Sequence, residues 1–180
     1  MKSIIITIAI IAMTISTFGA TMTPANFRKG VDAAVKFITE KESFRASWYD
    51  DATGKSISGK NGSCKGTPTI GHGVTGAYWN SNTITREKSL AIVRKIVEAD
   101  AKKIVLAMKN TPTPNNLAAL CSLAYRRGVD PVLRSNTFKA INERNWNKMN
   151  REWKGFNTSG GVVMPGLNKR CLEEIKLFFK

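Results

Sequence analysis

Two acidic residues nine positions apart, Glu42 and Asp51, are the first side chains in this sequence that could share a reaction. A pair of carboxyl groups cleaves a glycosidic bond when one donates a proton to the leaving oxygen and the other activates water or stabilises positive charge on the sugar. Glu42 follows an apolar helical pattern and Asp51 opens a polar, glycine-rich stretch, so their environments differ as this chemistry requires. Solvated surface pairs also occur at this spacing, so the spacing alone does not decide.

The elements around this pair follow from hydrophobic periodicity. Thr23-Pro24 is typical of a helix start, and the apolar residues after it recur every three or four positions, which predicts a helix that ends near Glu42. From Trp48 to about Tyr78 glycine is dense and helical periodicity is absent, which predicts short strands and turns. The helical pattern then returns in one long segment, 85–108, and in shorter ones at 115–128, 136–144, 146–154 and 167–178.

These elements predict an α+β protein in which a small β-rich lobe is inserted between a first helix and a larger helical lobe. A chain of 180 residues is long enough for one domain that a cleft divides into two lobes. Hydrophobic residues make up 42% of the sequence, which is enough to bury a core. The helix over 85–108 is long enough to join the two lobes.

Residues 1–22 have the pattern of an export signal. Lys2 precedes an Ile-rich stretch without charged side chains, and small residues follow it. A buried core segment is one alternative and a weak membrane anchor is another, since Thr, Ser and Gly dilute the apolar character. We predict that residues 1–22 are a signal or releasable membrane-anchor segment, and that residues 23–180 form a domain that works outside the cytoplasm.

The charge balance of the chain restricts its partners. Twenty-eight Lys and Arg residues against 13 Asp and Glu give a net charge of +15, which favours nucleic acid, an anionic membrane or an anionic cell wall. Export makes nucleic acid a weaker candidate. It also permits a disulfide among Cys64, Cys121 and Cys171, with one thiol left over. A single His and the lack of a Cys-x-x-Cys motif predict no metal site.

The run from Glu42 to Asp51 resembles the opening of the phage-type lysozymes, glycoside hydrolase family 24, whose motif is Glu, eight residues, Asp, five residues, Thr. Thr69-Ile70-Gly71 is similar to the element that follows in that family. Three later segments resemble further family elements in the same order: Asn116–Tyr125, Ser135–Asn142 and Gly160–Glu174. The resemblance therefore covers nearly everything after residue 35.

The sequence departs from the family pattern in several places. Seventeen residues separate Asp51 from Thr69 instead of five, so about twelve residues are added, and we call residues 52–68 the insertion. The other departures are His72 for the usual Tyr, Val74 for His, Phe156 for Trp and Cys171 for Arg. None of them removes a residue that the family motif needs for catalysis.

The resemblance implies a role for each motif residue. Glu42 would be the general acid, Asp51 would orient or deprotonate the attacking water or stabilise the transition state, and Thr69 would hold that water. The alternatives are a solvated helix-end charge, a turn residue and an ordinary strand threonine. We expect His72 to have a packing or hydrogen-bonding role and no catalytic role. We expect Arg45 to form an ion pair with an acidic residue near the cleft.

The resemblance further implies a lysozyme fold and a monomeric endolysin that needs no cofactor. It would hydrolyse the β-1,4 bond between N-acetylmuramic acid and N-acetylglucosamine of peptidoglycan, with inversion, in the periplasm or cell envelope during host lysis. Its partners would be peptidoglycan and the anionic envelope surface, and not nucleic acid. Two alternatives remain open: a lytic transglycosylase on the same bond, and a non-catalytic cationic protein that binds wall or membrane. An exported nuclease lacks the expected clusters of His and acidic residues.

Overall fold

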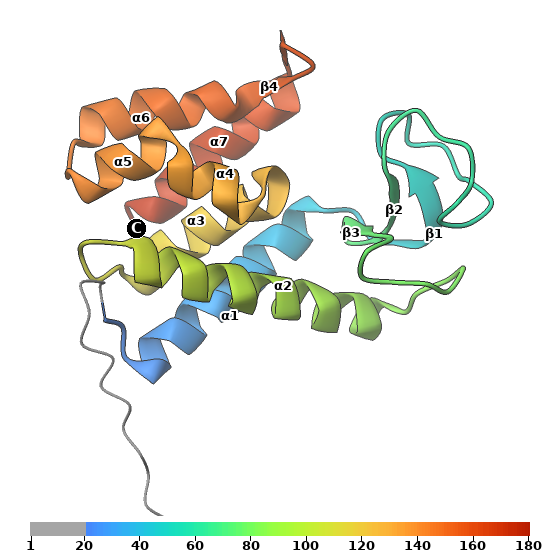
Figure 1. Cartoon of the computed structure of the whole chain (residues 1–180), viewed down its shortest axis with the longest axis horizontal. Helices are drawn as coiled ribbons and strands as arrows, with labels where there is room; N and C mark the ends of the chain where they lie inside the picture. The colour runs from blue at the N-terminus through green and yellow to red at the C-terminus, as the bar shows by residue number, and fades with distance from the viewer. Residues whose placement is uncertain (1–20) are drawn as a thin grey trace, which may run out of the picture.

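The computed structural model describes residues 21–180, which form a small β lobe and a larger helical lobe (Figure 1). The export prediction for residues 1–22 therefore falls, except for its last two positions, outside the described residues. The helices are α1 (Pro24–Lys41), α2 (Arg86–Ala107), α3 (Pro114–Arg127), α4 (Val129–Arg134), α5 (Asn136–Asn142), α6 (Trp146–Lys154), the 3-10 turn Gly155–Asn157 and α7 (Pro165–Phe178). The strands are β1 (Arg45–Asp50), β2 (Pro68–Gly71), β3 (Val74–Thr75), β4 (Thr158–Ser159) and β5 (Val162–Val163).

Helix α1 brings Glu42 to the junction of the two lobes. The Thr23 side chain caps the helix by accepting a hydrogen bond from the Asn26 N–H at 3.2 Å, and Pro24 occupies the first turn. The helix ends where Glu42 adopts an extended conformation, with φ −93° and ψ 116°. The chain then enters β1, so the predicted helix end at Glu42 is confirmed.

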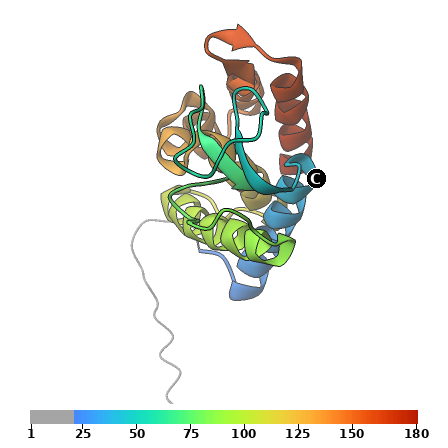
Figure 2. The same cartoon turned by 90° about the vertical axis from the view of Figure 1, so that its right-hand side faces the viewer.

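The β lobe is an antiparallel sheet in the order β1-β2-β3. Thr69 on β2 pairs with Tyr49 on one side and with Thr75 on the other, and Asp51 follows directly after β1. The sheet is short. The insertion connects β1 to β2 as a long irregular segment beside the sheet (Figure 2). The strands and turns predicted between Trp48 and Tyr78 are therefore present.

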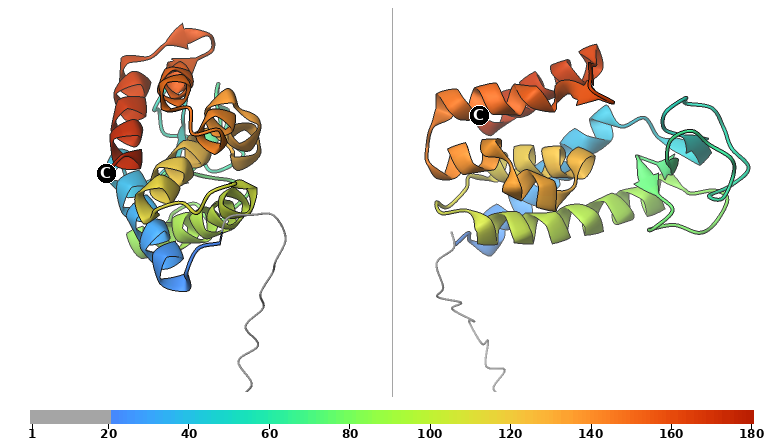
Figure 3. Two further views of the ribbon diagram at one scale, coloured as in Figure 1. Left: turned by 90° about the vertical axis from the view of Figure 1, so that its left-hand side faces the viewer. Right: turned by 45° about the horizontal axis from the view of Figure 1, so that its top comes forward.

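Helices α2 and α3 organise the helical lobe. Helix α2 runs from the β lobe along the helical lobe, as the prediction for residues 85–108 required (Figures 1 and 3). Helix α3 packs against α1, α2, α4 and α7, and its residues 117–124 are all buried. Thr113 and Asn116 form a capping box at its start, and Gly128 ends it with φ +82°. The predicted α+β arrangement, with a small β-rich lobe between the first helix and a larger helical lobe, is confirmed.

Three short elements were not predicted from the sequence: helix α4, the 3-10 turn Gly155–Asn157 and the β4–β5 hairpin. Helix α4 has six residues, and the β4–β5 hairpin has two residues in each strand. The hairpin stands on the edge of the helical lobe that faces the β lobe (Figures 1 and 3). Helix α7 follows the hairpin and packs on α3, which places Arg170 and Glu174 in the interior.

Candidate active site

The structure places Glu42, Asp51 and Thr69 around one cleft of about 510 Å³. Both lobes contribute to its walls. The β lobe supplies Tyr49, Thr67, Gly73 and Thr75, and the helical lobe supplies Tyr125, Arg126, Arg127, Thr158, Ser159 and Leu167. The three residues singled out by the motif, 27 positions apart at most, therefore meet at the junction of the lobes.

The two carboxylate oxygens of Glu42 face different parts of the site. Oε1 lies 3.1 Å from Nη1 of Arg170, in an ion pair whose arginine side chain is 8% exposed and whose glutamate side chain is 28% exposed. Oε2 faces the turn at Gly73, 3.7 Å from where a Cβ of that residue would stand. The helical lobe thus fixes one oxygen, and the other is turned toward the β lobe.

A buried polar network holds Arg170 in place. Its Nη2 donates to Ser122 Oγ at 3.2 Å, and the Ser122 hydroxyl donates to Glu174 Oε1 at 2.8 Å. Glu174 is fully buried and also accepts hydrogen bonds from the Arg126 guanidinium and from Nε1 of Trp153. Sequence reasoning did not identify Arg170 as the partner of Glu42. The i,i+4 spacing of Arg170 and Glu174 was the available signal.

Asp51 is exposed, and one side of its carboxylate is fixed. The backbone N–H of Thr67 donates a hydrogen bond to Asp51 Oδ1. Among residues 21–180, no group donates to Oδ2, which leaves this oxygen available to water.

Thr69 is buried in β2, and its hydroxyl donates to the Thr67 carbonyl oxygen at 3.0 Å. Because the hydroxyl proton is used in this bond, the Thr69 oxygen can act toward a bound water only as an acceptor.

Asp50 was not recognised from the sequence, although it precedes Asp51. Its side chain is buried and accepts four hydrogen bonds from residues of the insertion. These bonds, led by the one from the Lys65 N–H, lower the pKa of Asp50 to about 2. In a sequence, an aspartate whose carboxylate is buried and holds a turn looks the same as an aspartate that is exposed on the surface.

Two tyrosines stand beside Glu42 with their hydroxyl groups kept neutral. Burial raises the pKa of both Tyr49 and Tyr125, and the negative charge of Glu42 raises each further. The Tyr125 hydroxyl donates to the His72 carbonyl oxygen at 2.8 Å, which ties α3 to the β lobe next to the cleft.

His72 itself lies outside the cleft lining and is buried. Its Nδ1 is 2.9 Å from Ser89 Oγ, and its Nε2 is 3.4 Å from Nη1 of Arg86. Burial lowers the pKa of His72, and the nearby Arg86 lowers it further. These contacts agree with the predicted packing and hydrogen-bonding role.

The prediction that Arg45 pairs with an acid was wrong. Arg45 donates to the carbonyl oxygen of Gly54 and lies over the Tyr49 ring at 4.6 Å from its centre. The insertion brings a backbone carbonyl close to β1, so the guanidinium finds an uncharged acceptor instead of a carboxylate.

The three cysteines, possible metal sites and possible membrane spans add no further chemistry to the described residues. Cys64, Cys121 and Cys171 are free thiols, the last two buried. Within residues 21–180, no cluster of three or more His, Cys, Asp or Glu side chains is arranged to hold a metal ion. In the same part of the chain, no helix combines the length and the apolar character needed to cross a bilayer.

Comparisons with known proteins agree with this geometry. The phage lysozyme family model matches residues 39–174. An endolysin of Bacillus phage B103 is 32% identical over 111 residues, which cover 61% of this chain and 42% of that protein. The chain thus aligns with less than half the length of this curated relative.

Solved structures show the same fold. The endolysin from Escherichia coli O157:H7 phage FAHEc1 superimposes with a TM-score of 0.66 at 25% identity, covering 91% of this chain and 97% of that one. The muramidase domain of SpmX from Asticaccaulis excentricus gives a TM-score of 0.67 at 20% identity, with 82% and 95% covered.

Proposed function

This chain belongs to the phage lysozyme family, and on that premise we propose that it is an endolysin with muramidase activity. Its substrate would be the β-1,4 bond between N-acetylmuramic acid and N-acetylglucosamine in bacterial peptidoglycan. The observation that carries this proposal is the meeting of Glu42, Asp51 and Thr69 around one cleft between the lobes. A cleft with two carboxyl groups in unlike surroundings supports hydrolysis of a sugar–sugar bond.

In the proposed reaction, Glu42 donates its proton to the oxygen that leaves the muramic acid C1. Oε2 suits this step because Oε1 is occupied by Arg170. Water attacks C1 as the C1–O bond breaks, and Asp51 Oδ2 receives the water proton. Thr69 accepts a hydrogen bond from the same water through its oxygen. Attack by a water held away from the leaving group inverts the anomeric carbon, which is the expected stereochemistry.

Glu42→Gln tests the catalytic part of this proposal. An amide cannot donate the required proton, so we expect the variant to lose clearing of outer-membrane-permeabilised cells in a turbidity assay. Glu173→Gln is the matched control, since Glu173 makes only a partly exposed pair with Lys41 and should leave clearing unchanged. Unchanged clearing by Glu42→Gln would favour the non-catalytic, cationic wall-binding alternative.

We also propose that residues 1–22 export the domain of residues 23–180 to the periplasm and cell envelope of the host for lysis, where it acts as a monomer. The uncharged stretch after Lys2 supports this part of the proposal, and the net charge of +15 suits an anionic envelope better than a crowded cytoplasm with its nucleic acids. Fusing residues 1–22 to a reporter enzyme that is active only outside the cytoplasm tests it. An inactive fusion would contradict export through this segment.

A further inference from the structure

The Asp50 carboxylate joins the two ends of the insertion. Its Oδ1 accepts from the backbone N–H groups of Ala52 at 3.0 Å and Gly66 at 2.9 Å. Its Oδ2 accepts from the Thr53 hydroxyl at 2.8 Å and from the Lys65 N–H at 3.0 Å. Each oxygen therefore binds one donor from the start of the insertion and one from its end. All four hydrogen bonds involve a charged acceptor, the stronger kind.

The end of the insertion in turn holds Asp51. Gly66 packs directly against this side chain, since a Cβ on Gly66 would overlap Asp51 Oδ1. The next residue, Thr67, donates its N–H to the same oxygen. Asp50 therefore fixes the backbone at Lys65 and Gly66, and the next residue, Thr67, orients the Asp51 carboxylate through its N–H.

Pro68 pairs with Asp50 in the sheet and the Asp51 N–H donates to the Thr67 carbonyl oxygen at 3.3 Å, but little else holds the residues just before them. Of residues 52–68 only Gly59 is buried, so the segment has no core of its own. Its first half pairs with β1, through the bonds from the Asp50 N–H to the Lys55 carbonyl and from the Ile57 N–H to the Trp48 carbonyl. The stretch that returns to β2 has no comparable pairing before Thr67, which makes the Asp50 carboxylate its main attachment.

We propose that Asp50 is a positioning residue for the reaction: it holds residues 65–67 so that the Thr67 N–H aims the Asp51 carboxylate at the attacking water. This inference rests on the function proposed for Asp51. Asp50 does not line the cleft, so it acts through Asp51 and does not touch substrate. The low pKa of Asp50 keeps its carboxylate ionised, and its four hydrogen bonds in place, at any pH near neutrality.

Asp50→Asn is the first test. One carboxylate oxygen becomes an NH₂ group, which cannot accept hydrogen bonds, so a backbone N–H of the insertion loses its partner. With soluble peptidoglycan fragments as substrate, we expect kcat to fall by at least about tenfold while KM stays within about twofold, because misaligned catalytic groups lower the rate more than binding. Amide hydrogen exchange at Thr67 should become faster. Asp32→Asn is the control, since Asp32 is exposed on α1 and pairs only with Arg94.

Gly66→Ala provides an independent variant, should Asp50→Asn fold poorly. It leaves the Asp50 carboxylate in place, but its Cβ would overlap Asp51 Oδ1 and come within 2.8 Å of the Ala52 backbone N. Asp51 and Ala52 must therefore shift, and the same selective loss of kcat is expected. Full kcat in both variants, in a wild-type protein that hydrolyses the fragments, would overturn the positioning role and leave the proposed function intact. A wild-type protein with no hydrolysis would overturn both, whatever the exchange at Thr67.

Discussion

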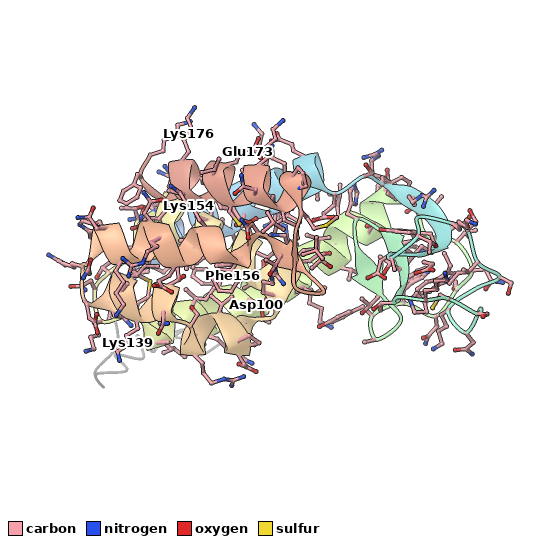
Figure 4. The ribbon with its side chains drawn as sticks, turned by 90° about the horizontal axis from the view of Figure 1, so that it is seen from above. Asp100, Lys139, Lys154, Phe156, Glu173 and Lys176 are labelled. Carbon is pink, nitrogen blue, oxygen red and sulfur yellow. The ribbon has the colours of Figure 1, made fainter. Side chains whose placement is uncertain are left out.

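Glu173 and Glu174 are neighbours in α7 with opposite surroundings. Glu174 is fully buried and pairs with Arg126, whereas Glu173 is 30% exposed in its pair with Lys41 and lies on the outer side of α7 (Figure 4). Removing one partner of a buried pair leaves the other charge uncompensated, while an exposed pair contributes little. The buried network is therefore a stability element, and through Arg170 it also fixes Glu42.

We predict that Glu174→Ala lowers the free energy of unfolding by about 3–5 kcal/mol, because it leaves the Arg126 guanidinium buried without its carboxylate. Glu173→Ala should cost less than about 1 kcal/mol. Urea unfolding of both variants measures these changes. Equal, small effects would mean that Arg126 finds another partner or reaches solvent.

Thr69 allows a test of the water-holding role with two conservative changes. Thr69→Val keeps the shape but removes the acceptor oxygen, and we expect kcat to fall by about a hundredfold, as for a misplaced reactant. Thr69→Ser keeps the oxygen and should retain most activity. Steady-state kinetics on soluble fragments distinguishes the two. Similar kcat values for Val and Ser would reduce Thr69 to an ordinary strand residue.

The sequence identified some single residues and missed others for definite reasons. Glu42, Asp51 and Thr69 could be named because the residues around them resemble the phage-type lysozyme motif, and the structure brings all three to one cleft. The partners Arg170 and Asp50 depend on contacts between segments 128 and 16 positions apart, which no local pattern reports. Arg45 was misassigned because its acceptor belongs to the insertion.

At the level of elements, the sequence predicted those with strong periodicity or capping signals. Thr23-Pro24 and Thr85 mark the starts of α1 and α2, and both caps are present. Helix α4 was missed because it has only six residues, with Pro131 among them. The β4–β5 hairpin was missed because its Val162 and Val163 are both exposed, so no alternation of buried and exposed residues exists there.

His72 links the β2–β3 turn to α2, and it predicts how that junction responds to pH. Its pKa in the folded protein is lowered from 6.5 by burial and by Arg86. The unfolded chain then binds more protons below pH 6.5, so stability is full above that pH and is lost as pH falls toward the lowered folded value. His72 is the chain's single histidine. The His72→Gln variant should therefore show a smaller change of the unfolding free energy with pH between about pH 7 and 5. An unchanged slope would contradict this.

For the whole molecule, the net charge of +15 is the dominant property. Lys139, Lys154 and Lys176 are exposed and project from the outer faces of the helical lobe (Figure 4). Such charges attract an anionic wall over distances that salt controls, whereas the chemistry takes place inside the cleft.

We therefore predict different salt dependences for wall binding and for bond cleavage. Raising NaCl from about 0.1 M to about 1 M shortens the screening length from about 10 Å to about 3 Å. Binding to intact walls, measured by co-sedimentation, should weaken strongly, while kcat on short soluble fragments stays within about twofold. A parallel fall of both would place the salt-sensitive charges in the cleft itself.

The most direct test of the central claim is product analysis in H₂¹⁸O. Peptidoglycan digested by the wild-type protein should carry one ¹⁸O at each new reducing muramic acid end, detected by mass spectrometry, and Glu42→Gln should release no such ends. A 1,6-anhydro muramic end without ¹⁸O would contradict hydrolysis and identify a lytic transglycosylase, which needs no water-activating Asp51.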